Sequence, residues 1–209
     1  MGQAEPQPRI YTVEEYMELE KHSDVRHEFY EGEIFARTGA SARHNSIAGN
    51  TYAFLLYALR GKKCRAYFES VQLEVAEGRY YNYPDVMVTC SPDDLRAERT
   101  MKEPVLVVEV LSKSTEGLDR TWKFNQYKQL PSLKHYLLVS QTTCSVEWYR
   151  REANDIWGFT ALVLFTDEIP LPELGVVLKL SDIYEETGVA QMVIRYDSED
   201  PDYKGRANE

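Results

Sequence analysis

The chain has 209 residues, of which 43% are hydrophobic and 28% are charged, a composition typical of a globular domain. Its longest apolar stretch, residues 105–111, is far shorter than the roughly 20 residues of a membrane-spanning helix, which excludes an integral membrane protein. A net charge of −10 argues against nonspecific binding to nucleic acid or anionic membranes, although residues 37–136 carry more basic than acidic side chains and could form a local positive cleft.

The N-terminal third predicts a helix, a hairpin and a second helix. Thr12 and Glu15 have the spacing of a capping box, which would begin a short helix. Residues 26–37 have the pattern of a β-hairpin. A longer helix would begin after Ser41, with apolar residues at helical spacing, and would end at Gly61.

The middle of the chain predicts strands followed by a crossover helix. Residues 67–75 alternate and predict a strand, and residues 80–89 predict a second strand. Residues 105–111 are apolar on both faces, which is typical of a central strand. A helix over 116–130 then precedes a buried strand at 135–139. This order indicates a mixed sheet with helices on its faces.

The C-terminal part predicts a β-hairpin and a short helix. The hairpin would pair residues 145–150 with 157–165, and the helix would span 181–186. The fold class is therefore α/β, a mixed sheet flanked by helices, with an N-terminal helix-hairpin and a C-terminal β-hairpin extension.

The ends of the chain and its cysteines set expectations about domain limits and location. Residues 1–9 are polar and have no apolar signal core, so we expect a flexible N-terminus and a cytoplasmic protein. Residues 188–209 predict a loose acidic tail after a single domain over 10–187. The three cysteines are widely spaced and odd in number, which argues against a disulfide scaffold or a zinc ribbon and fits a reducing compartment.

Glu109 is the most informative single residue, because it lies inside the apolar strand over 105–111. Burying an unpaired carboxylate costs several kcal/mol, so such a residue is often retained for function. A buried salt bridge or a strand end open to water would be the structural alternative. Asp85, after Pro84, lies on the preceding strand, although Pro-Asp is also a common turn pair. Two acids on neighbouring strands could share a divalent cation, and hard oxygen ligands favour Mg²⁺ or Mn²⁺ over zinc.

Other charged residues could complete such a site. Lys123 and Tyr127 follow Asp119 on one helical stripe, where an exposed ion pair is equally plausible from spacing alone. His44, at the start of a helix, could meet a phosphate, although a solvated histidine is the commoner case. One of three acids around the hairpin turn could also reach the metal: Glu28, Glu31 or Glu33. Because no nucleophile motif is present, this set favours metal-assisted attack of water on a phosphodiester.

These pieces, in this order, resemble the Uma-type endonucleases, a bacterial family within the restriction-endonuclease-like PD-(D/E)XK superfamily. The resemblance covers roughly residues 10–186 and depends on seven segments, namely 11–16, 27–33, 41–45, 83–86, 107–115, 119–127 and 135–139.

The resemblance implies a restriction-endonuclease-like core and a Mg²⁺-dependent endonuclease that cuts DNA, with Mn²⁺ as a substitute and no organic cofactor. Asp85, Glu109 and the Val110 carbonyl would hold the metal. The superfamily's usual lysine position is Leu111 here, whereas the family pattern places the lysine at Lys123, with Lys113 as a second choice. A homodimer that does not associate with membranes is also implied.

Two other functions remain open from the sequence. A catalytically degenerate module with this fold could bind nucleic acid or a protein partner without cutting. A metal-dependent phosphoesterase could act on small nucleotides.

Overall fold

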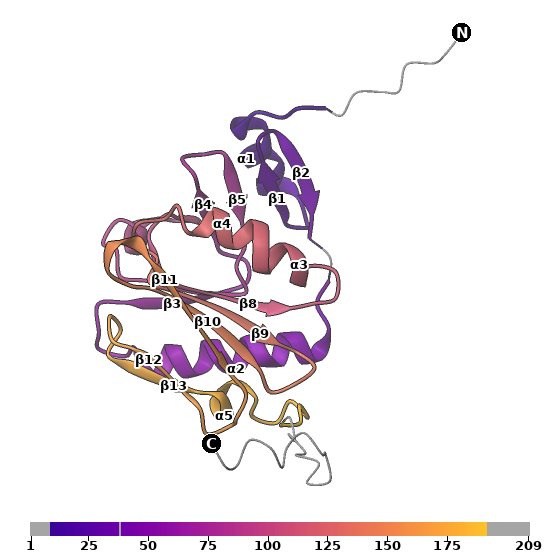
Figure 1. Ribbon diagram of the computed structural model, residues 1–209. Coiled ribbons are helices and arrows are strands. Elements are labelled where there is room, and N and C mark those ends of the chain that lie inside the picture. Colours follow the sequence, from indigo (N-terminus) through magenta and orange to yellow (C-terminus); the bar gives the residue numbers. More distant parts are fainter. Residues whose placement is uncertain (1–8, 38, 192–209) are drawn as a thin grey trace, which may run out of the picture.

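The computed structural model describes residues 9–37 and 39–191, and its main feature is a six-stranded mixed sheet (Figure 1). The strands lie in the order β11-β10-β9-β8-β6-β3. β8 and β9 are parallel and the other neighbours are antiparallel, which confirms the predicted mixed sheet. The bounds are Arg65–Phe68 (β3), Val86–Thr89 (β6), Pro104–Leu111 (β8), His135–Ser140 (β9), Val146–Arg151 (β10) and Trp157–Leu162 (β11).

Strand β8 is covered on both faces, as its apolar sequence predicts. Val108 lies in the core that helix α2 (Ala42–Ala58) closes with Leu55. Val107, which points the other way, packs in a second core with Tyr127. Glu109 lies two residues after Val107, on the same face of the strand, and is only 3% exposed, so the carboxylate is buried.

A second, five-stranded sheet packs on the face of β8 opposite α2. Its order is β2-β1-β5-β4-β7, and its residues Leu73 and Tyr80 belong to the same core as Tyr127. The predicted hairpin forms its β1–β2 edge, next to α1, whose capping box at Thr12 is confirmed. The bounds are Val13–His22 (α1), His27–Tyr30 (β1), Glu33–Ala36 (β2), Gln72–Val75 (β4), Tyr80–Asn82 (β5) and Thr100–Met101 (β7).

Two predicted strands were wrong, because each is divided between the two sheets. The segment 67–75 turns at Glu69, whose φ is 50°, so that β3 and β4 lie in different sheets. The segment 80–89 breaks at Pro84, which has no N–H for the ladder, so that β5 and β6 also separate. The sequence analysis treated each segment as one continuous strand and did not predict either break.

The predicted helix over 116–130 is shorter and is not a regular α-helix. It consists of α3 (Glu116–Leu118), a π-helical turn η2 (Asp119–Lys123) and α4 (Phe124–Tyr127). Single π-helical turns of this kind occur frequently at functional sites.

The predicted C-terminal hairpin forms and belongs to the six-stranded sheet. Strands β10 and β11 pair as expected, and β10 also pairs with β9, so the hairpin extends the sheet at this edge. A separate hairpin, which the sequence analysis did not predict, pairs β12 (Glu168–Leu171) with β13 (Val176–Lys179). The short helix α5 spans Leu180–Ile183 rather than 181–186, and 3₁₀ turns occupy Asp94–Arg96 (η1) and Ala153–Asp155 (η3).

The cysteines differ from the expectation, because Cys64 and Cys90 form a disulfide while Cys144 is free and buried. Cys64 comes directly before Arg65, and Cys90 comes directly after Thr89. Because Arg65 and Thr89 pair across β3 and β6, strand pairing brings the two cysteines together. Within the described ranges, no helix is long and apolar enough to cross a membrane. The predicted flexible N-terminus and acidic tail lie largely outside the described residues.

Candidate active site

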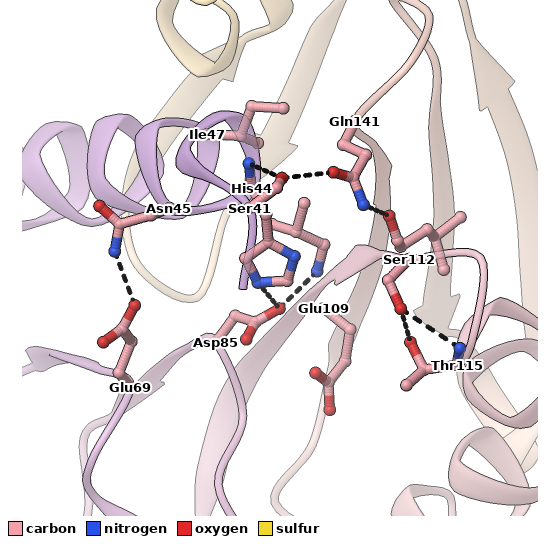
Figure 2. Close-up of polar contacts among 12 residues, drawn as sticks. Ser41, His44, Asn45, Ile47, Glu69, Asp85, Glu109, Ser112, Thr115 and Gln141 are labelled. Carbon is pink, nitrogen blue, oxygen red and sulfur yellow. Dashed lines mark hydrogen bonds and ion pairs between the residues drawn. The ribbon is translucent and has the colours of Figure 1, made fainter. Parts of the chain in front are cut away.

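Asp85 and Glu109 lie beside each other at one end of the six-stranded sheet. Strand β6 begins directly after Asp85 and is antiparallel to β8, with Val86 opposite Val108. This register continues to Asp85 and Glu109, and Figure 2 shows both side chains leaving adjacent backbone segments. The interruption of the strand between β5 and β6 thus positions the Asp85 carboxylate at the end of the sheet, next to the buried Glu109.

Three donors hold the Asp85 carboxylate. Its Oδ2 accepts a hydrogen bond from the Val110 backbone N–H at 2.8 Å and lies 3.1 Å from His44 Nε2, while its Oδ1 accepts from Arg37 Nη2 at 3.2 Å. Burial alone would raise the pKa of Asp85, but these donors, His44 foremost, lower the pKa below its usual value. Asp85 is therefore an oriented, ionised carboxylate.

The environment of Glu109 shifts its pKa in the opposite direction to that of Asp85. Its Oε1 accepts from the Tyr127 hydroxyl at 2.7 Å and from Lys123 Nζ at 3.3 Å. Burial raises the pKa of Glu109 to about 8, because desolvation and the nearby Asp85 outweigh the charge of Lys123. Without a further positive charge, this carboxyl therefore retains a proton at neutral pH.

Lys123 is surrounded by three acidic side chains. Its Nζ lies 3.1 Å from Asp119 Oδ1, 3.3 Å from Glu109 Oε1 and 3.7 Å from Glu28 Oε1. Burial alone would lower the pKa of Lys123, but Glu109 and Glu28 raise it well above its usual value. The ammonium group is charged and is directed at the buried glutamate by the π-helical turn that carries it.

His44 is held by the N-terminus of α2. Ser41 caps this helix by accepting the His44 backbone N–H, which fixes the first turn and directs the imidazole at Asp85 (Figure 2). Burial lowers the pKa of His44, but the hydrogen bond to Asp85 raises it more, so the net pKa is above its usual value. The contact with the ionised Asp85 carboxylate therefore favours the protonated form of the partly buried His44.

These groups line a cavity of about 630 Å³. It lies between the β1–β2 hairpin, the C-terminal end of β8, the segment 112–123 and the first turn of α2. The lining residues are Glu28, Tyr30, Phe35, Ala36, Arg37, Gly39, Ala40, Ser41, His44, Tyr80, Asp85, Glu109, Val110, Ser112, Ser114, Thr115, Leu118, Trp122, Lys123 and Gln141.

Not every residue suggested by the sequence reaches this cavity. Of the three hairpin acids, Glu28 lines it, whereas Glu31 lies in the turn and Glu33 is exposed on β2. Lys113 is also exposed and is not among the lining residues. Tyr127 lies behind the cavity wall and contacts it through its hydrogen bond to the Glu109 carboxyl.

The sequence analysis did not identify several residues of the site. Arg37 contacts Asp85, and Tyr80 donates a hydrogen bond to Glu28 Oε2 at 3.3 Å. Gln141 links the α2 cap to β8, since it accepts from Ser41 and donates to the Leu111 carbonyl (Figure 2). Arg37 could have been suspected as a basic residue between the hairpin and the helix, but no spacing pattern indicates the other two.

The donor set fits a magnesium-type ion in a shared site rather than a full protein cage. Among the described residues, no group of three or more histidine, cysteine or acidic side chains is arranged to hold a metal. Asp85 and Glu109 offer two carboxylates, and Val110 directs its backbone toward Asp85, because the N–H and C=O of one strand residue point to the same side. Mg²⁺ is commonly held by one or two carboxylates with water and substrate phosphate as the other ligands.

Comparisons with known proteins show the family and the fold of the chain. Two proteins of Synechocystis sp. strain PCC 6803, named uncharacterized proteins slr1290 and sll1609, are each 33% identical to the chain, over 86% and 74% of its length and 93% and 89% of their own. A crystal structure from Anabaena variabilis ATCC 29413, described as "a putative nuclease belonging to DUF820", has a TM-score of 0.67 at 17% identity. The match covers 83% of this chain and 97% of that one, and it shows a shared restriction-endonuclease-like fold. Since a family model also matches residues 13–181, the chain belongs to the Uma2 family, described as "Putative restriction endonuclease".

Proposed function

We propose that this protein is a metal-dependent endonuclease that hydrolyses DNA phosphodiester bonds by in-line attack of water. The observation that carries the proposal is the meeting of Asp85, Glu109 and Lys123 at one cavity, from three separate elements. The nuclease description of the family supports the reaction class.

Asp85, Glu109 and the Val110 carbonyl would hold Mg²⁺ or Mn²⁺, and the raised pKa of Glu109 is consistent with a site that gains a positive charge on loading. A bound divalent cation supplies charge for a phosphodiester oxygen and acidifies a water ligand. Asp85 reaches this role already ionised and oriented, because His44 Nε2 and the Val110 N–H hold it.

Lys123 and Arg37 would act on the phosphodiester itself. The Lys123 ammonium has three acidic neighbours and can turn one N–H toward a phosphoryl oxygen or toward the attacking water. The Arg37 guanidinium contacts only one Asp85 oxygen, which leaves other N–H groups for the charge that develops on the phosphorus oxygens.

Plasmid nicking in Mg²⁺, Mn²⁺ and EDTA tests the proposal. Metal-dependent nicking should be lost in Asp85→Asn and Glu109→Gln and reduced in Glu28→Gln, whereas the exposed Glu33→Gln serves as the matched hairpin control. Nicking that persists in the first two variants would contradict the proposed site.

A binding module that does not cut is the second candidate. The net charge of −10 and the ion pairs that already occupy Arg37, His44 and Lys123 favour it. Absence of nicking, together with metal-independent binding of an oligonucleotide or protein, would support this alternative. The proposed homodimer depends only on the family resemblance and is tested by sedimentation of the purified protein.

A further inference from the structure

Two large apolar side chains are exposed within the cavity that contains the acidic residues. Phe35 on β2 is 49% exposed and Leu118 on α3 is 54% exposed, and both line the cavity. They come from different walls, one from the hairpin and one from the helical segment after β8. Apolar side chains at such a site provide contact area for a ligand that is more than a phosphate group.

The hairpin register places Phe35 on the same face as the charged residues. Phe35 pairs with Glu28 across β1 and β2, and directly paired residues project from one face of a sheet. Glu28 in turn lies 3.7 Å from Lys123 Nζ. The phenyl ring therefore projects from the same face of the hairpin as Glu28, and both line the cavity together with Lys123.

The cavity wall between these positions is a fixed aromatic group. The Trp122 ring packs edge-on against Tyr30 and Tyr80, and its centroid lies 4.8 Å from the centroid of each tyrosine ring. Tyr80 is further tied by its hydrogen bond to Glu28. The aromatic wall is thus held in place before any ligand enters.

The charges of the cavity are poorly suited to a stacked duplex. Its ionisable lining residues are three acids and three bases, and each base already faces an acidic side chain: Arg37 and His44 face Asp85, and Lys123 faces Glu109. Duplex binding depends mainly on many unpaired cations at phosphates. An unpaired base instead offers a free π-face, on which an aromatic side chain can stack.

We propose that the cavity binds an unpaired nucleobase against Phe35 and Leu118 while the attached phosphodiester lies at Asp85 and Glu109. The preferred substrate is then single-stranded DNA, or a nucleotide extruded from a duplex, rather than a fully paired duplex. This inference depends on the proposed nuclease function for its phosphodiester position, but its base-binding part can be tested separately.

Fluorescence titration with 2-aminopurine, a base whose emission is quenched by stacking, tests base binding directly. The probe is carried in a single strand, in a paired duplex and in a duplex with an unpaired bubble, with Ca²⁺ present in place of Mg²⁺. We expect quenching with the single strand and the bubble, but not with the duplex. Phe35→Ala should weaken binding by about fivefold or more, since one base–aromatic stack contributes about 1–3 kcal/mol.

Matched variants separate stacking from general effects. Phe35→Tyr keeps the ring and should bind like the wild type. Phe159→Ala removes a similarly exposed phenylalanine, 56% exposed on β11 and outside the cavity lining, and should change nothing. Since Phe35 is exposed, its alanine variant should fold, which its melting temperature can confirm.

The outcomes distinguish this inference from the proposed function. Equal binding by Phe35→Ala and Phe159→Ala, or tighter binding of the paired duplex without quenching, would overturn the base pocket even if plasmid is cut. Quenching that depends on Phe35 would support the base pocket even if no strand is cut.

Discussion

Replacing Glu109 with glutamine should stabilise the metal-free protein at alkaline pH. Folding raises the pKa of this carboxyl from 4.5 to about 8, so the folded state holds a proton that the unfolded state releases. The associated stability is fully present below pH 4.5 and is lost as the pH rises through 8. Glutamine resembles the neutral carboxyl and keeps an acceptor oxygen for Tyr127 and Lys123.

The magnitude follows from the same pKa values. At 1.36 kcal/mol per pKa unit, a rise from 4.5 to about 8 means that the free energy of unfolding is about 5 kcal/mol lower at the alkaline limit than at the acidic limit. At pH 7 the corresponding loss is about 3 kcal/mol. For a domain of this size, that difference is about 6–12 °C in melting temperature.

Thermal unfolding in EDTA from pH 5 to pH 9 measures the effect. The wild type should lose stability with rising pH relative to Glu109→Gln, and the curves should converge near pH 5. The Glu33→Gln variant should follow the wild type, because this glutamate is exposed. Parallel curves for Glu109→Gln and wild type would refute the argument that desolvation controls the protonation of Glu109.

Three further results are expected. Mn²⁺ at 100 times its dissociation constant should stabilise the wild type by about 2.7 kcal/mol but not Asp85→Asn, and an equal melting shift in both would place the metal elsewhere. Lys123→Met should abolish nicking while the exposed Lys113→Met should not, as plasmid assays of both variants would show. His135 has its pKa lowered by burial, so stability should fall as the pH drops below 6.5. Replacing His135 with glutamine should flatten that part of the melting-temperature profile, and an unchanged profile would exclude His135 as its origin.

The sequence indicated Asp85 and Glu109 because each residue contrasts with its immediate neighbours along the chain. A carboxylate inside an apolar strand marks Glu109, and a proline in a strand pattern marks the adjacent Asp85. Both signals are contained in segments of fewer than ten residues. The sequence also suggested that the two strands are neighbours because they are consecutive, and the structure pairs them, antiparallel.

Other features could not be predicted because they depend on packing between distant segments. The segments 67–75 and 80–89 each resemble one strand in sequence, but each contributes strands to two different sheets. The π-helical turn has no distinctive spacing, and the contact of Arg37 with Asp85 arises only when the hairpin packs beside β8. Pairing of Cys64 with Cys90 likewise requires β3 and β6 to be neighbours.

The hydrogen bond from Ser41 to Gln141 has a consequence for folding during synthesis as well as for the folded structure. This hydrogen bond joins residues 100 positions apart, and the Lys123–Glu28 pair also spans much of the chain. Contacts between such distant residues form late, because a long loop must close first. During synthesis, the cavity can therefore be completed only after β9 has left the ribosome. A nascent chain or a fragment ending before Gln141 contains both acidic residues but lacks this contact between the α2 cap and the end of β8.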